Sequence, residues 1–148
     1  MRKRVFGRRF KKDYDQRKAL FKSLITALVV HGQIKTTEAK AKAIRAEVEK
    51  MVTKAKKRGG ESRYHLIKHV NTDIADRIIT DIAPVFKDRP GGYVRIFRTP
   101  HRLKDNAQMV VVEWVEKIAT TEAPKKTETK KLSDSVVERK VSKTKSNK

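Results

Sequence analysis

The sequence contains no cysteine, and this absence removes several kinds of site together. Without thiols, a chain has no disulfide, no thiolate zinc site and no cysteine nucleophile. Long apolar runs are missing too, and none approaches the roughly 20 residues of a membrane-spanning helix. A membrane protein is therefore not expected, and the lack of cysteine fits a reducing compartment such as the cytoplasm.

Acidic residues are scarce: 17 Asp and Glu stand against 38 Lys and Arg in 148 residues, a net charge of +21. Such an excess favours a polyanionic partner, above all nucleic acid. It begins in a basic arm, residues 1–12, which holds seven cations, no anion and a glycine that weakens any helix. Cations on an extended arm repel one another until phosphates neutralise them. The alternative is a solvated tail or a localisation tract.

Catalytic patterns are also absent. His65 and His69 have the i, i+4 spacing of metal ligands, but no third ligand accompanies them in the sequence. The two Gly-Gly pairs lack the spacing of a phosphate-binding loop. Asp13 and Asp15 are better explained as helix caps than as an acid–base pair. We therefore expect no enzyme, no metal, no cofactor and no small-molecule substrate.

Residues 13–118 are expected to form one body, which begins with two helices joined by an extended segment. The first helix spans 13–31, with Asp13 and Gln16 as a reciprocal cap and Gly32 as the stop. Residues 33–36 are extended, and a second helix runs to about residue 58. The apolar stripe of the first helix is Leu20, Phe21, Leu24, Ile25 and Leu28. That of the second is Ala41, Ile44, Val48, Met51, Val52 and Ala55.

The second half of the body contains shorter elements. We expect a third helix over 61–70 and a fourth from 72 to about 83, where Pro84 should end it. Strands over 93–99 and 109–115 should pair antiparallel through a basic loop, with the second strand buried on much of both faces. Residues 119–148 hold nine cations, four anions and no aromatic, so a disordered basic extension is expected.

Basic residues recur on the arm, the outer face of the second helix, the first long strand and its loop. Phe6, Phe10 and Tyr93 lie among them, where they can stack on unpaired bases, although core packing is an equal alternative for Phe10 and Tyr93. Strand alternation puts Arg95 on the face of Tyr93 and Arg98 on the other face. Arg95 is therefore favoured as a contact, unless it pairs with an acidic neighbour. The segment 31–36 is too extended for a helix-turn-helix.

Several motifs resemble one family, the bacterial large-subunit ribosomal protein L17. They are Met1-Arg2-Lys3-Arg4 with Gly7-Arg8, Ile34-x-Thr36-Thr37, Lys40-Ala41-Lys42, Glu49, Met51-Val52-Thr53, Gly91-Gly92-Tyr93-Val94-Arg95-Ile96 and Asp105-Asn106-Ala107. The resemblance covers residues 1–117. The chain departs from the pattern at Lys3, Gln16 and Lys104.

This resemblance implies an α+β fold: a two-layer α/β body with a small three-stranded mixed sheet and about four helices over one face. It implies a structural, non-catalytic protein that binds large-subunit rRNA near the peptide exit tunnel, beside neighbouring ribosomal proteins. A DNA-compacting architectural protein is the alternative. The predicted RNA contacts are Arg2, Lys3, Arg4, Arg8, Arg9, Lys11, Lys12, Arg17, Lys18, Lys22, Lys35, Lys42, Tyr93, Arg95, Arg102 and Lys104.

Overall fold

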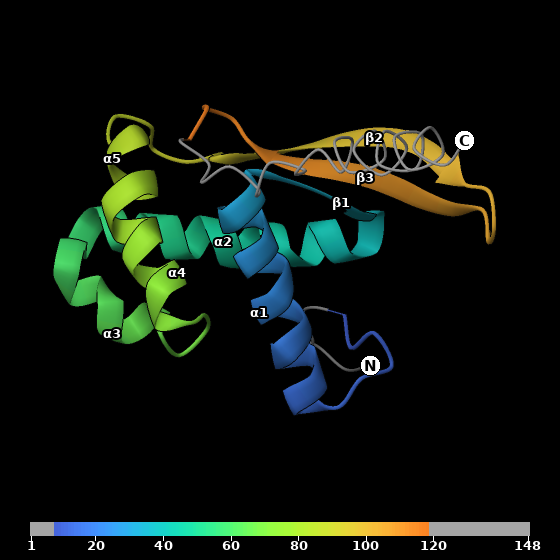
Figure 1. The fold of residues 1–148 in the computed structure, drawn as a ribbon, viewed down its shortest axis with the longest axis horizontal. Coiled ribbons are helices and arrows are strands. Elements are labelled where there is room, and N and C mark those ends of the chain that lie inside the picture. The colour runs from blue at the N-terminus through green and yellow to red at the C-terminus, as the bar shows by residue number, and fades with distance from the viewer. Residues whose placement is uncertain (1–7, 119–148) are drawn as a thin grey trace, which may run out of the picture.

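The computed structural model describes residues 8–118, and these form helices packed on one side of a small sheet (Figure 1). The 3-10 turn η1 and the π-helical turn η2 lie among the helices. The elements are α1 Tyr14–His31, β1 Gln33–Thr37, α2 Glu38–Arg58, η1 Gly59–Ser62, α3 Arg63–Leu66, α4 Thr72–Arg77, η2 Ile78–Ile82, α5 Ala83–Val85, β2 Val94–Arg102 and β3 Ala107–Trp114. The α+β class and the helices on one face are as expected.

The sheet has the order β1-β3-β2, and both pairings are antiparallel. The expectation of a mixed sheet is therefore wrong. Both β1 and β2 run antiparallel to β3. They therefore have the same direction as each other, and they lie on opposite sides of β3. Side chains of β3 alternate: Val110, Val112 and Trp114 are buried under the helices, and the residues between them are half-buried. The strand thus has one buried face instead of two.

The helix α2 provides the largest part of the core and runs along the sheet (Figure 1). All six stripe residues predicted for it are buried, so its period and both ends are confirmed. On α1, only Ile25 and Leu28 of the predicted stripe are fully buried, together with Val29. Gly32 ends α1 in the left-handed conformation, with φ of 74° and its N–H donated to the Leu28 carbonyl. The side chain of Asp13, the residue before α1, makes no capping hydrogen bond, contrary to the expected box.

The third predicted helix ends earlier than expected. The elements η1 and α3 span residues 59–66, and residues 67–70 lie outside regular helix. The fourth continues past Pro84 as α4, η2 and α5. Pro84 has no N–H for the preceding turn, and the wide η2 turn, closed by the Ala83 N–H on the Ile78 carbonyl, lies just before it. The π-turn thus takes up the disruption that was expected to end the helix.

The β2–β3 hairpin is longer than predicted and takes in most of the expected loop. Pro100 lies inside β2, which a central strand would not tolerate. It is accepted here because β2 is an edge strand, with a register shift between Thr99 and Arg102. The turn keeps only residues 103–106, and Asn106 has φ of 50°.

Candidate nucleic-acid interface

The start of α1 and the turn before it carry cations that form no ion pair with any carboxylate of residues 8–118. Arg17, Lys18 and Lys22 project from α1, and none forms an ion pair within residues 8–118. Arg9 and Lys12 close a tight turn by an N–H···O bond of 3.1 Å. These residues were predicted contacts, and the fold brings them to one end of the molecule.

An aromatic pair holds this end together. The Arg17 guanidinium carbon lies 5.2 Å from the centre of the Phe21 ring, a cation–π contact. Phe10 meets the same ring edge-on, with ring centres 6.3 Å apart. Phe10 and Lys11 reach this position with φ of 58° and 52°, a backbone region that side chains other than Gly, Asn and Asp rarely adopt. Residues 9–12 are therefore a turn folded onto α1 rather than part of an extended arm.

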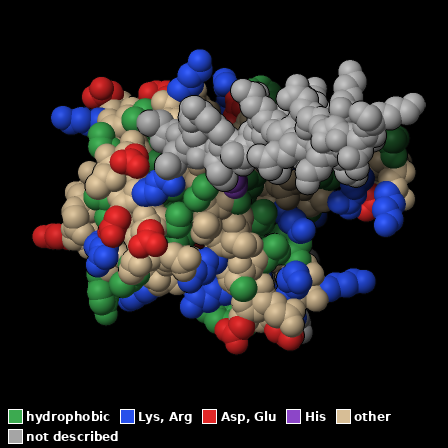
Figure 2. Space-filling model, viewed as in Figure 1, with side chains coloured by type: hydrophobic (Ala, Val, Ile, Leu, Met, Phe, Trp, Pro, Cys, Tyr) green, Lys and Arg blue, Asp and Glu red, His purple; other side chains and the backbone are tan. Residues whose placement is uncertain are grey.

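Charge is distributed unevenly over the described residues. Residues 8–58 hold 16 cations and 5 anions, a net charge of +11, whereas residues 61–88 hold 4 cations and 5 anions, a net charge of −1. Figure 2 shows most of the red side chains over the end that contains α3 to α5, with blue ones among them, and further blue side chains toward α1 and the hairpin. The molecule therefore has a cationic side and a nearly neutral end.

The hairpin arginines differ from the α1 cations because they have acidic partners. Arg95 Nη2 lies 2.6 Å from Glu113 Oε1 across the strand pair, as the alternative for this residue allowed. Arg102 Nη2 lies 2.6 Å from Asp105 Oδ2, and this bond holds the pKa of Asp105 down at about 2. Lys104, in the same turn, is exposed and has no acidic partner among residues 8–118.

A second cluster surrounds Glu38 at the start of α2. Its carboxylate lies 2.7 Å from Lys42 Nζ and 3.8 Å from Arg98 Nη2. The hydrogen bond from Lys42 is the main cause of a lowered pKa of Glu38, and Arg8 adds a weaker attraction. Three cations around one carboxylate leave an excess of two positive charges at this corner.

The prediction for Tyr93 as a base-stacking residue is wrong, because its ring is fully buried. It packs against Phe86 at 5.1 Å between ring centres, and its hydroxyl donates to the Pro90 carbonyl at 3.3 Å. Tyr93 precedes β2, so strand alternation does not set its direction. It shares no sheet face with Arg95, which lies on the exposed face.

A group of cations on the outer face of α2 was not among the RNA contacts predicted from the sequence. Lys50, Lys54, Lys57 and Arg58 line a groove of about 740 Å³, together with His65 from α3. Arg58 Nη1 lies 3.0 Å from His65 Nε2. The i, i+4, i+7 spacing of the three lysines was the available signal, although Lys57 and Arg58 in the last turn also interact favourably with the helix dipole.

The remaining predicted RNA contacts lie apart from these groups or outside residues 8–118. Lys35 is on the exposed face of the sheet, opposite Val111. Arg2, Lys3, Arg4 and the extension 119–148 lie outside the described residues. Within residues 8–118, no three His, Cys, Asp or Glu side chains are grouped to hold a metal. No helix in that range is both long and apolar enough to cross a bilayer.

Comparison with known proteins identifies the family. The sequence profile of ribosomal protein L17 matches residues 20–115. The chain belongs to this family. It is 42% identical over 116 residues to the large ribosomal subunit protein bL17 of Gemmatimonas aurantiaca, an alignment that covers 78% of this chain and 98% of the relative. The bL17 of Persephonella marina is 45% identical over 119 residues, covering 78% and 96% of the two chains.

Membership of the L17 family makes the protein a structural, non-enzymatic constituent of the large ribosomal subunit. The similarity to a third bL17, from Thermodesulfovibrio yellowstonii, is 39% identity over 117 residues, covering 78% of this chain and 88% of the relative. The resemblance read from the sequence motifs is thereby confirmed.

Proposed function

We propose that this L17 protein binds and stabilises folded large-subunit rRNA near the peptide exit tunnel, in cytoplasmic ribosomes and beside neighbouring large-subunit proteins. The family resemblance supports this location, and the relatives are named as large-subunit proteins. The basic arm brings seven cations over residues 1–12, of which residues 9–12 form the turn folded onto α1, and we propose that these cations also bind phosphates.

The cations of α1 that lack acidic partners are the observation that carries this proposal. A cation already paired with a carboxylate gains less from a phosphate, because the pair must first be broken. Arg17, Lys18 and Lys22 have no such pair to break among the described residues. Each phosphate that they neutralise releases condensed counterions, and this release drives binding. Contacts of this kind position the protein and carry little base information.

The charge distribution also orients the protein on the RNA. The cationic surface comprises the turn before α1, the exposed side of α1 and the outer groove of α2. The end formed by residues 72–88 holds 2 cations and 4 anions, a net charge of −2, so phosphates do not attract it. We place this end away from RNA, toward solvent or a neighbouring protein.

Salt-dependent binding to large-subunit rRNA tests the proposal. The double change Lys18→Gln and Lys22→Gln removes two unpaired charges without touching the core. The slope of log K against log salt should fall by about 1.4–1.8, because each phosphate contact contributes roughly 0.7–0.9. Affinity at low salt should fall with it.

The matched control is Lys87→Gln with Lys117→Gln, which lowers the net charge by the same amount outside the proposed surface. Both lysines are exposed and without an ion pair in the described part of the chain. The control should keep most of the slope. Equal losses from the two double variants would mean that only total charge matters, and would contradict a defined rRNA surface.

A further inference from the structure

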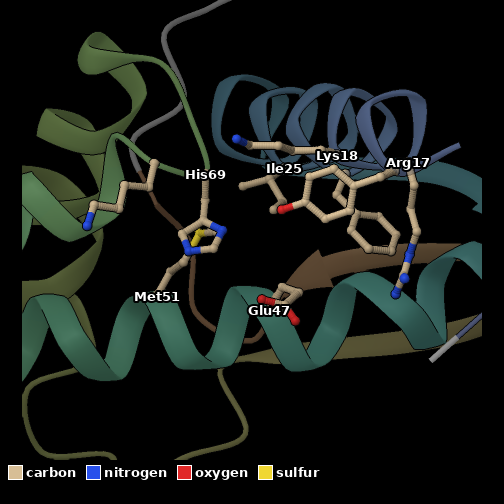
Figure 3. Close-up of a pocket in the computed structure, with 9 residues that line it drawn as sticks. Arg17, Lys18, Ile25, Glu47, Met51 and His69 are labelled. Atoms are coloured by element: carbon tan, nitrogen blue, oxygen red, sulfur yellow. The ribbon is translucent and has the colours of Figure 1, made fainter. Parts of the chain in front are cut away.

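A cleft between α1 and α2 combines an apolar floor with a cationic rim (Figure 3). Its volume is about 560 Å³, within the range of about 300–1,000 Å³ that is usual for pockets that hold small molecules. Phe21 and Ile25 of α1 and Met51 of α2 form the floor. Tyr14 stands at its side with 80% of its surface exposed. Such a cleft offers a planar ligand the exposed ring of Tyr14 beside an apolar floor.

The rim of the cleft is positively charged. Arg17 and Lys18 come from α1, and Lys68 comes from the segment after α3. Arg17 is held by stacking on Phe21, and its Nε is buried without a hydrogen-bond partner among residues 8–118. Lys68 Nζ lies 4.9 Å from the ring centre of Tyr64, a contact that leaves its charge uncompensated. The rim therefore favours an anionic group beside the apolar floor.

One carboxylate enters the cleft from the opposite wall. Glu47 of α2 lines the cleft together with His69 and Arg17, and Figure 3 shows it over α2, between these two residues in that view. Its only ion pair within residues 8–118 is a long one, 3.9 Å to Lys50 Nζ. A carboxylate in this position accepts hydrogen bonds from N–H groups of a planar ligand. The three features together fit a nucleotide: stacking for the base, cations for the phosphate, and an acceptor for the base edge.

We propose that this cleft binds a single unpaired nucleotide of RNA, with guanine preferred. The inference rests on the proposed function, because it makes the cleft part of the RNA-binding surface. Guanine presents two adjacent donors, N1–H and N2–H, to the two oxygens of one carboxylate, the parallel geometry that also makes arginine–carboxylate pairs strong. Uracil presents one N–H on that edge. Stacking between a base and an aromatic side chain provides the rest of the affinity.

Two RNA hairpins that differ only in one bulged guanine test this proposal with the full chain. The bulged hairpin should bind about tenfold more tightly than the fully paired one, since the two share the same loop and only the bulged stem offers an additional free base to stack. Tyr14→Ala should abolish this preference and leave affinity for the paired hairpin almost unchanged. The matched control is Phe97→Ala, which removes an aromatic ring that is 47% exposed on the sheet, outside the cleft. It should keep the preference.

Replacing the bulged guanine by uracil tests the role of Glu47. Wild type should prefer the guanine hairpin several-fold, and Glu47→Gln should reduce that preference. Glu49→Gln, the same change on the same helix but outside the cleft, should not. If wild type binds bulged and paired hairpins equally, the cleft proposal is overturned while rRNA binding stands. If it binds no hairpin at any salt concentration, both proposals fail.

Discussion

Arg102 and Asp105 form a two-point ion pair across the turn between β2 and β3. Arg102 Nε donates to Asp105 Oδ1 at 2.8 Å, and Nη2 donates to Oδ2 at 2.6 Å. Asp105 Oδ1 also accepts the N–H of Ala107 at 3.3 Å, which fixes the carboxylate at the start of β3. The guanidinium of Arg102 is thus rigidly placed, but its charge is balanced until the carboxylate is removed.

The variant Asp105→Asn should therefore bind large-subunit rRNA more tightly than wild type. The amide keeps an oxygen for the Ala107 N–H, but it no longer neutralises Arg102. One additional phosphate contact should steepen the salt slope by about 0.7–0.9. Asp88→Asn makes the same change in net charge at the end that we place away from RNA, and should have a smaller effect. Equal gains from both variants would contradict a role for the hairpin turn.

The pKa of Asp105 gives a direct test of the same pair. Arg102 lowers it from an ordinary value of 3.8 to about 2, chiefly through the hydrogen bond. Because the folded value lies below the unfolded one, the pair stabilises the turn fully above about pH 4 and is lost as the pH falls through 2. The NMR carboxyl shift of Asp105 should titrate near pH 2. In Arg102→Gln, the midpoint should rise toward 3.8, and an unchanged midpoint would show that Arg102 is not the cause.

Burial on α2 predicts opposite outcomes for two substitutions by aspartate, one on the buried face of the helix and one on its exposed face. Ile44 is fully buried, so Ile44→Asp should lower the free energy of unfolding by several kcal/mol, because it buries an unpaired charge. The Lys50 side chain is 68% exposed, and Lys50→Asp should leave the melting temperature almost unchanged. Thermal unfolding followed by circular dichroism distinguishes the two. Similar losses from both would contradict the orientation of α2.

Local patterns predicted α2 well because a 3.6-residue period, a glycine stop and charges at both ends agree over 21 residues. The π-turn before Pro84 was not predictable in this way, since it depends on helix packing that keeps the chain helical beyond the proline. The length of the hairpin was missed because Pro100 disfavours a strand, and only the sheet order shows that β2 is an edge.

The contact residues were predictable as cations, but not as paired or unpaired cations. Sequence position says nothing about whether Arg95 meets Glu113, which lies 18 residues away across the sheet. The burial of Tyr93 likewise results from packing against Phe86. The cleft between α1 and α2 joins residues from positions 14 to 69, and only the tertiary structure brings them together.

Sedimentation with purified ribosomal subunits tests the proposed function most directly. The full chain should sediment with large subunits depleted of their own L17 protein, and should remain bound at high salt, where non-specific phosphate binding is weakened. It should not sediment with small subunits under those conditions. Release at moderate salt, or equal binding to both subunits and to duplex DNA, would contradict a defined site on large-subunit rRNA and would favour a non-specific architectural protein.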